Sequence, residues 1–232
     1  MVPVFNLYGA TECPGIATNG KIRAGTEVKL LDIPELGYSQ QDTPWPRGEI
    51  LVRADNMASG YYKDPDLTAK SFVDGFYCTG DIGALKDGNI LHVIDRKANL
   101  LELYVQGRSV WISASRLESI FSRIPGIHQM YLHGDRMSGF PVAVIVPTSE
   151  ELHRGDMNLQ IVRGNILHDM KVLGQEHGLQ EYEIPRGIVL TCEPWSVASG
   201  LITPTGKVKR GAVQEKFLDS IWEEIVFVQK ES

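Results

Sequence analysis

The chain has 232 residues, of which 43% are hydrophobic and 22% are charged, a composition typical of a folded globular protein. Its formal net charge of −6 argues against a large basic surface for nucleic acid or for an anionic membrane. We therefore expect small-molecule or protein partners and no nucleic acid. One or two domains are compatible with this length.

The sequence contains no run of about 18 apolar residues that would predict a transmembrane segment. Its N-terminus lacks the basic segment and apolar core of a secretion signal, so we expect a cytoplasmic location. Cys13, Cys78 and Cys192 are odd in number and far apart. This pattern favours reduced thiols over disulfides or a zinc site.

The first hundred residues are predicted to be rich in strands. Val28 and Leu30 alternate with charged residues, and residues 48–53 form a compact run of β-type residues. The dipeptide Asp64-Pro65 combines a capping residue with a proline at a first helical position. A short helix through about Phe72 follows from this pair.

The dipeptide Asp87-Gly88 lies between two apolar runs, residues 82–85 and 90–94, and is the strongest hairpin signal in the sequence. This hairpin places Asp81 just before its first strand and Arg96 just after its second. We therefore expect the two side chains to lie near each other although fifteen positions separate them.

After Arg96 the pattern predicts strands mixed with helices. Ser115 and Glu118 have the spacing of a capping box at the start of a helix. Strands are expected near 130–133 and 142–146, and further helices from 161 to about 178 and from 212 to 225.

Four short motifs occur in order along the chain: Tyr8-Gly9-Ala10-Thr11-Glu12, Tyr77-Cys78-Thr79-Gly80-Asp81, Asp95-Arg96-Lys97 and Thr203-Pro204-Thr205-Gly206-Lys207. In this order and at this spacing they resemble the later motifs of adenylate-forming enzymes. That superfamily includes acyl-CoA synthetases, firefly luciferase and nonribosomal-peptide adenylation domains. The phosphate loop that such enzymes carry upstream does not occur in these residues, so we expect the C-terminal portion of such an enzyme.

The resemblance implies an α+β fold in two domains. Residues 1–95 would be the β-rich end of a large AMP-binding domain whose N-terminal part is missing, and residues 96–232 would be a small mobile α+β domain. The stretches 28–38, 44–49 and 57–63 are most similar to the adenylation domains of carboxylic acid reductases, followed by long-chain acyl-CoA synthetases. The start of the chain, directly before the first motif, favours a truncation.

The resemblance also assigns roles to the first motif. Tyr8, with Gly9, would hold the adenine of ATP, Thr11 would bond the α-phosphate, and Glu12 would help to hold Mg²⁺, a hard cation that prefers oxygen ligands. By itself, the same string would be interpreted as a turn at a strand end followed by a solvated acid.

Two further residues would complete the adenylation chemistry. Asp81 would accept hydrogen bonds from the ribose hydroxyls, and Arg96 would donate to the sugar or the phosphate. Lys207 would place an ammonium group between the substrate carboxylate and the α-phosphate, where negative charge develops. Outside this context, Asp81 would be an ordinary loop residue and Lys207 a solvated surface lysine.

For transfer of the acyl group, the resemblance places Gly107 in the loop passed by the thiol of coenzyme A or of a phosphopantetheine carrier. Ala98 stands at the hinge position, where relatives usually have Asp or Lys. The implied substrate is a carboxylic acid, with a fatty acid favoured, and a carrier domain is a candidate partner.

Two classes of function therefore stand. The chain is either the C-terminal part of an acyl-activating enzyme or a non-catalytic module of that fold that binds protein or nucleotide. In both cases we expect the isolated chain to bind ATP weakly and to be inactive.

Overall fold

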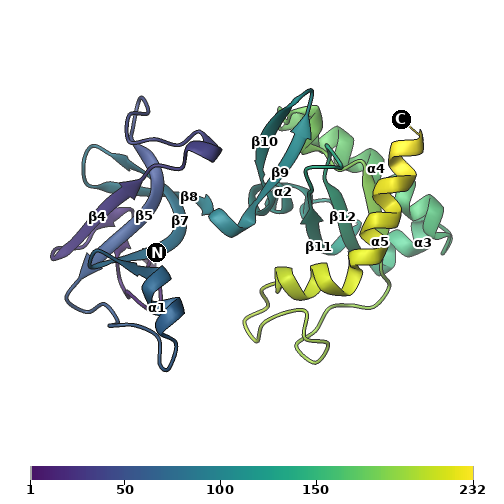
Figure 1. Ribbon diagram of the computed structural model, residues 1–232. Helices are drawn as coiled ribbons and strands as arrows, with labels where there is room; N and C mark the ends of the chain where they lie inside the picture. Colours follow the sequence, from purple (N-terminus) through teal and green to yellow (C-terminus); the bar gives the residue numbers. More distant parts are fainter. Residues whose placement is uncertain (1, 232) are drawn as a thin grey trace. The chain divides into compact units, whose positions relative to one another are not determined.

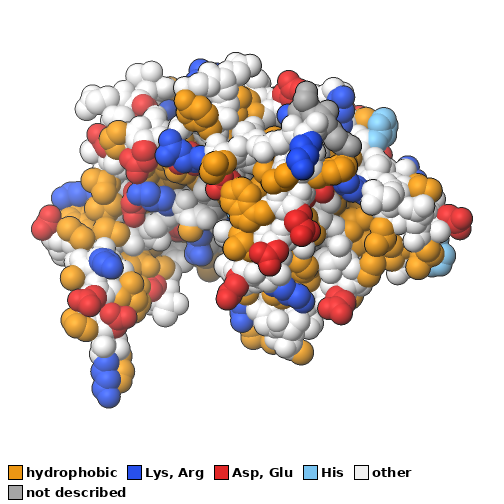
Figure 2. Space-filling model, turned by 45° about the vertical axis from the view of Figure 1, so that its right-hand side comes forward, with side chains coloured by type: hydrophobic (Ala, Val, Ile, Leu, Met, Phe, Trp, Pro, Cys, Tyr) orange, Lys and Arg blue, Asp and Glu red, His pale blue; other side chains and the backbone are white. Residues whose placement is uncertain are grey.

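The computed structural model describes residues 2–231, and the chain divides into two compact units, Met1–Asn99 and Leu100–Ser232 (Figure 1). The boundary predicted at residues 95 and 96 lies within strand β8 (Ile90–Arg96), whereas the division between the units follows Asn99. Within the described residues, no helix is both long and apolar enough to cross a membrane. Figure 2 shows Lys and Arg side chains interspersed with Asp and Glu side chains on the face drawn.

The first unit is built on an eight-stranded sheet with the order β1-β2-β3-β8-β7-β5-β4, in which β6 pairs with β7. All of its pairings are antiparallel. Its elements are β1 (Leu7–Tyr8), β2 (Ala17–Thr18), β3 (Lys21–Ile22), β4 (Thr26–Leu31), η1 (Pro34–Leu36), β5 (Arg47–Ala54), α1 (Pro65–Ser71), β6 (Phe72–Val73), β7 (Phe76–Lys86), β8 and η2 (Lys97–Asn99).

Local signals produce the predicted elements of this unit. Asp64 caps α1 by accepting a hydrogen bond from the Leu67 N–H at 2.9 Å, as its position before Pro65 indicated. Strands β4 and β5 cover the two predicted β-type runs and pair with each other. Ile50 and Val52 of β5 are fully buried in the core of the unit.

The predicted hairpin is formed by β7 and β8. Asp87 and Gly88 both have positive φ, 51° and 71°, as the central residues of a turn that favours Asp-Gly do. The Asn89 N–H donates to the Lys86 carbonyl at 3.2 Å and closes this turn, and pairing begins at Lys86 and Ile90. The strands are longer than predicted, because Asp81 and Arg96 belong to them and lie directly opposite each other in the register. The expectation that these two side chains meet is confirmed by a salt bridge at 3.1 Å.

The second unit contains a hairpin of β9 and β10 and a three-stranded sheet in which β11 and β12 are antiparallel while β12 and β13 are parallel. Its elements are β9 (Leu100–Val105), β10 (Arg108–Ser113), α2 (Ala114–Phe121), β11 (Ile127–His133), β12 (Val142–Pro147), α3 (Ser149–Arg154), α4 (Leu159–Glu176), η3 (Glu181–Glu183), β13 (Gly187–Leu190) and α5 (Arg210–Glu231). The strands and helices predicted after residue 125 are all present.

The three-stranded sheet separates two apolar cores, because successive side chains of a strand point to opposite faces. Ala143 and Ile145 of β12 pack in the core that contains α2 and α4. Val144 and its neighbours two positions away pack in the core that contains α5. Figure 1 shows α5 (yellow) along this sheet. Burial on both sides explains why all six residues of β12 are buried.

The predicted capping box at Ser115 is wrong. Ser113 is the N-cap of α2, and its hydroxyl oxygen accepts from the Arg116 N–H at 3.1 Å. Glu118 instead accepts from the Leu132 N–H at 2.7 Å and from Arg210 at 2.7 and 2.9 Å. The Glu118 carboxylate therefore bonds the Arg210 guanidinium and a backbone N–H in a half-buried position. Such charge-assisted bonds are stronger than the local bond that a capping box would form at an exposed helix end.

Candidate functional site

A cavity of about 500 Å³ opens in the first unit. It is lined by Ala98 and by residues of three of the four motifs: Gly9, Ala10, Thr11, Glu12, Tyr77, Thr79, Gly80, Asp81 and Arg96. The loop after β1 supplies one wall, and the paired strands β7 and β8 supply the other. The fold therefore brings together residues that lie almost ninety positions apart.

Asp81 is the most tightly held acid of this cavity, with 7% of its surface exposed. Its Oδ2 accepts a hydrogen bond from the Tyr8 hydroxyl at 2.7 Å, and its Oδ1 accepts from Arg96 Nε at 3.1 Å. Burial raises the pKa of Tyr8 well above its usual value, so this hydroxyl remains a donor at neutral pH. The carboxylate thus has one fixed orientation.

Thr79 is a neighbour of Asp81 that was not among the predicted site residues. Its hydroxyl donates to the Ile50 carbonyl at 2.8 Å and accepts from the Asp81 N–H at 3.0 Å. It ties the cavity end of β7 to β5 and orients the backbone that carries Asp81. In the sequence, this role of Thr79 was indicated only by its position two residues before Asp81 in the second motif.

Glu12 is the second acid of the cavity. Its Oε1 accepts from the Tyr61 hydroxyl at 2.6 Å, and this hydrogen bond holds the pKa of the Glu12 carboxyl below its usual range. Tyr77 also lines the cavity, and burial raises the pKa of its hydroxyl. Glu12 therefore offers an ionised carboxylate near neutral pH.

The residues present fit Mg²⁺ in one specific way. Among the described residues, no group of three or more His, Cys, Asp or Glu side chains could hold a metal by itself. Mg²⁺ is commonly held by one or two carboxylates, with phosphate oxygens and waters as its other ligands. Glu12 can be such a carboxylate if a nucleotide supplies the phosphates.

Of the other predicted site residues in this unit, some line the cavity and one packs against the core. Gly9 and Thr11 line the cavity, and a Cβ on Gly9 would lie only 2.7 Å from the Gly15 nitrogen, so a larger residue would disturb the loop. Tyr8 packs against the core of the unit and points its hydroxyl at Asp81. Ala98, the predicted hinge residue, lies on the cavity wall within η2.

Lys207 belongs to the second unit and is exposed. Its loop is closed by a hydrogen bond from the Thr203 N–H to the Lys207 carbonyl at 2.7 Å, and by one from the Lys207 N–H to the Thr203 hydroxyl at 3.0 Å. Gly206 has a φ of 81°, which a glycine adopts without strain. The loop backbone is thus held by these bonds, while Lys207 itself is exposed.

Gly107 lies in the two-residue turn that joins β9 and β10. It has a φ of 83°, and Gln106 before it has a φ of 50°. The turn lacks the Asn-Gly or Asp-Gly signature that identified the first hairpin, which explains why this second hairpin was not predicted.

No protein-family model matches the chain. A carboxylic acid reductase of Mycobacterium tuberculosis is 39% identical over 207 residues, which are 88% of this chain and 17% of that protein. The peroxisomal long chain acyl-CoA synthetase 6 of Arabidopsis thaliana is 35% identical, over 87% of this chain and 30% of that protein.

Among solved structures, the A-PCP didomain of carboxylic acid reductase from Segniliparus rugosus, in complex with AMP, matches with a TM-score of 0.88 and 30% identity. The match covers 99% of this chain and 32% of that one. The chain therefore spans about a third or less of the length of the relatives it matches.

Proposed function

Because this chain belongs to the adenylate-forming superfamily, together with carboxylic acid reductases and long-chain acyl-CoA synthetases, we propose that it is the C-terminal part of an ATP-dependent acyl-activating enzyme. That enzyme converts a carboxylic acid, with a fatty acid favoured, to an acyl-adenylate and pyrophosphate. The observation that carries the proposal is the cavity in which Asp81, Arg96, Thr11 and Glu12 converge.

The sugar of the nucleotide binds at Asp81. An ionised carboxylate has about four lone-pair sites on its two oxygens, and Tyr8 and Arg96 occupy one site on each. Both oxygens therefore keep acceptor capacity for a vicinal diol. Because the Arg96 side chain is 70% exposed, its remaining N–H groups are accessible to the sugar or to a phosphate.

The phosphates bind beside Thr11 and Glu12. The Thr11 hydroxyl donates to the α-phosphate, and the Glu12 carboxylate is a ligand of the Mg²⁺ that accompanies ATP. When bound, the metal neutralises phosphate charge and thereby permits approach of the anionic carboxylate.

Lys207 completes the site for the adenylation step. The ammonium group offsets the charge that develops as the substrate carboxylate oxygen attacks the α-phosphorus and pyrophosphate leaves. Lys207 is exposed and forms no ion pair with another described residue, which is compatible with a group that engages only bound substrate. A lysine suits this role because it is a compact charge on a flexible stem.

The acyl group then passes to a thiol, either of coenzyme A or of a phosphopantetheine carrier domain. The didomain relative, whose description includes a PCP, supports a carrier as partner, and the CoA synthetase relative supports coenzyme A. Gly107 is the proposed passage for the thiol and Ala98 the proposed hinge. The location we propose is cytoplasmic.

The test of this function is pyrophosphate exchange by the full-length protein that contains these residues. Lys207→Ala should lower exchange by about a thousandfold, since groups that stabilise developing charge contribute on this order, and should leave nucleotide binding nearly unchanged. The matched control is Lys209→Ala, because Lys209 is also exposed and lies two residues away. Equal exchange by Lys207→Ala and wild type would contradict the proposal, and nucleotide binding without any exchange by wild type would support the non-catalytic alternative.

A further inference from the structure

The loop between β5 and α1 lies against the acid that we assign to Mg²⁺. The Ala58 N–H donates to the Glu12 carbonyl at 2.7 Å, and the Tyr61 hydroxyl donates to Glu12 Oε1 at 2.6 Å. One contact holds the main chain of Glu12 and the other holds its side chain. Both come from residues more than forty positions away, and neither belongs to the four motifs.

Tyr61 is itself held in place. Its N–H donates to the Thr68 hydroxyl at 2.9 Å, and that hydroxyl donates to the Asp64 carbonyl at 2.7 Å. Its ring packs edge-on against Phe72, with ring centroids 6.0 Å apart. A Cβ on Gly60 would lie 2.6 Å from Thr68 Cγ2, so this approach of the loop to α1 requires glycine. The phenol hydroxyl is thus presented from a fixed support.

A donor in this position lowers the entropic cost of metal binding by a glutamate side chain. The glutamate side chain has three rotatable bonds, and it loses conformational entropy when a metal fixes one rotamer. A hydrogen bond that has already selected the rotamer removes part of this cost, as partners behind metal ligands do in general. It leaves the second carboxylate oxygen as the atom that can bind the cation.

We propose that Tyr61 is a positioning residue that orients the Glu12 carboxylate for the Mg²⁺ that accompanies the nucleotide. This inference rests on the proposed function and adds a residue to its site. Tyr61 does not touch the nucleotide or the metal, and it acts through Glu12.

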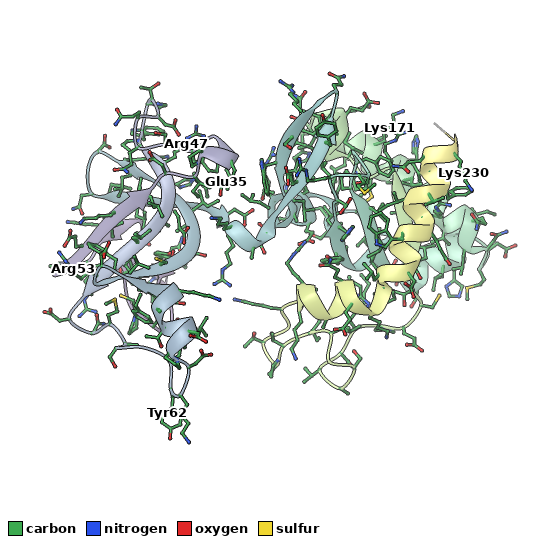
Figure 3. The ribbon with its side chains drawn as sticks, viewed as in Figure 1. Glu35, Arg47, Arg53, Tyr62, Lys171 and Lys230 are labelled. Atoms are coloured by element: carbon green, nitrogen blue, oxygen red, sulfur yellow. The ribbon has the colours of Figure 1, made fainter. Side chains whose placement is uncertain are left out.

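The test uses Tyr61→Phe, which keeps the ring on Phe72 and removes only the hydroxyl. The matched control is Tyr62→Phe, because Tyr62 is 88% exposed and lies at the tip of the same loop, away from the sheet (Figure 3). The conformation of the Glu12 side chain is followed by NMR scalar couplings in this chain. In the full-length protein, pyrophosphate exchange is measured against Mg²⁺ concentration.

For Tyr61→Phe, the Glu12 side chain should change from one preferred rotamer to several, because the hydrogen bond that selects the rotamer is lost. The Mg²⁺ concentration for half-maximal exchange should rise about tenfold, of the order found when a partner behind a metal ligand is removed. Tyr62→Phe should change none of these.

An unchanged distribution of Glu12 rotamers, or an unchanged Mg²⁺ requirement in Tyr61→Phe, would overturn the assignment. These results are distinguishable from failure of the proposed function, which would appear as absence of exchange in the wild-type protein.

Discussion

Arg210 lies at the start of α5 and contacts α2 and β11. We expect its replacement to lower the stability of the second unit. Its Nη1 donates to both carboxylate oxygens of Glu118 on α2, and its Nη2 donates to the Leu132 carbonyl on β11 at 2.8 Å. Its guanidinium also lies over the Tyr131 ring at 4.7 Å. Arg210→Met keeps the apolar stem and removes all of these polar contacts.

The magnitude follows from the burial of the pair. Removing one partner of a fully buried ion pair costs about 3–5 kcal/mol. The Arg210 and Glu118 side chains are 23% and 20% exposed, so we take the lower end. Loss of the cation–π contact adds about 0.5 kcal/mol, and removal of a positive charge at a helix N-terminus returns a similar amount. The expected loss is about 3 kcal/mol.

The assay is urea unfolding of the whole chain, followed by NMR signals of Ala143 and Val144 in the central strand of the second unit. With a slope of about 2 kcal/mol per M, Arg210→Met should lower the midpoint by about 1.5 M. Lys216→Met is the control on the same helix, because Lys216 and its partner Glu193 are 43% and 88% exposed, and it should cost well under 1 kcal/mol. Equal midpoints for the two variants would refute this reasoning.

Two further predictions concern pH and the nucleotide. Burial holds the pKa of His133 below its usual value, so the unfolded chain binds a proton near pH 6.5 that the folded chain does not bind. Stability of the second unit should therefore fall as pH drops below about 6.5, and His133→Gln should lose less between pH 7.5 and 5.5 in the urea assay; an equal loss would show that other groups are responsible. Asp81→Asn should weaken AMP binding by the full-length protein about tenfold or more, because a charged acceptor is lost. Asp74→Asn, at an exposed turn, should leave the affinity in calorimetric titration unchanged, and the idea fails if both variants bind equally well.

Features encoded by neighbouring residues were predictable from the sequence. Asp87-Gly88 specified the turn of its hairpin, and from that turn the approach of Asp81 to Arg96 followed directly. Asp64-Pro65 specified the start of α1 in the same way. In each case the determining interaction spans only a few residues of backbone.

Features that depend on distant partners were missed. Glu118 has the spacing of a capping residue, but Arg210, 92 positions away, determines where its side chain points. Tyr61 is 49 positions from Glu12, and nothing near it in the sequence indicates that contact. Strand β13 pairs in parallel with β12, so no turn signal precedes it. The hairpin of β9 and β10 was missed for a local reason, because its turn lacks the usual dipeptide. The other features were missed because they depend on long-range pairing.

The roles of the site residues are a proposal, and the first unit supplies the cavity in which Asp81 lies. A crystal structure of the full-length protein with a bound acyl-adenylate, or a stable analogue of it, is the most direct test of the account. We predict that both ribose hydroxyls lie within hydrogen-bond distance of the Asp81 carboxylate and that Lys207 Nζ contacts an oxygen of the α-phosphate. Asp81 and Lys207 side chains that both point away from the ligand would contradict the account.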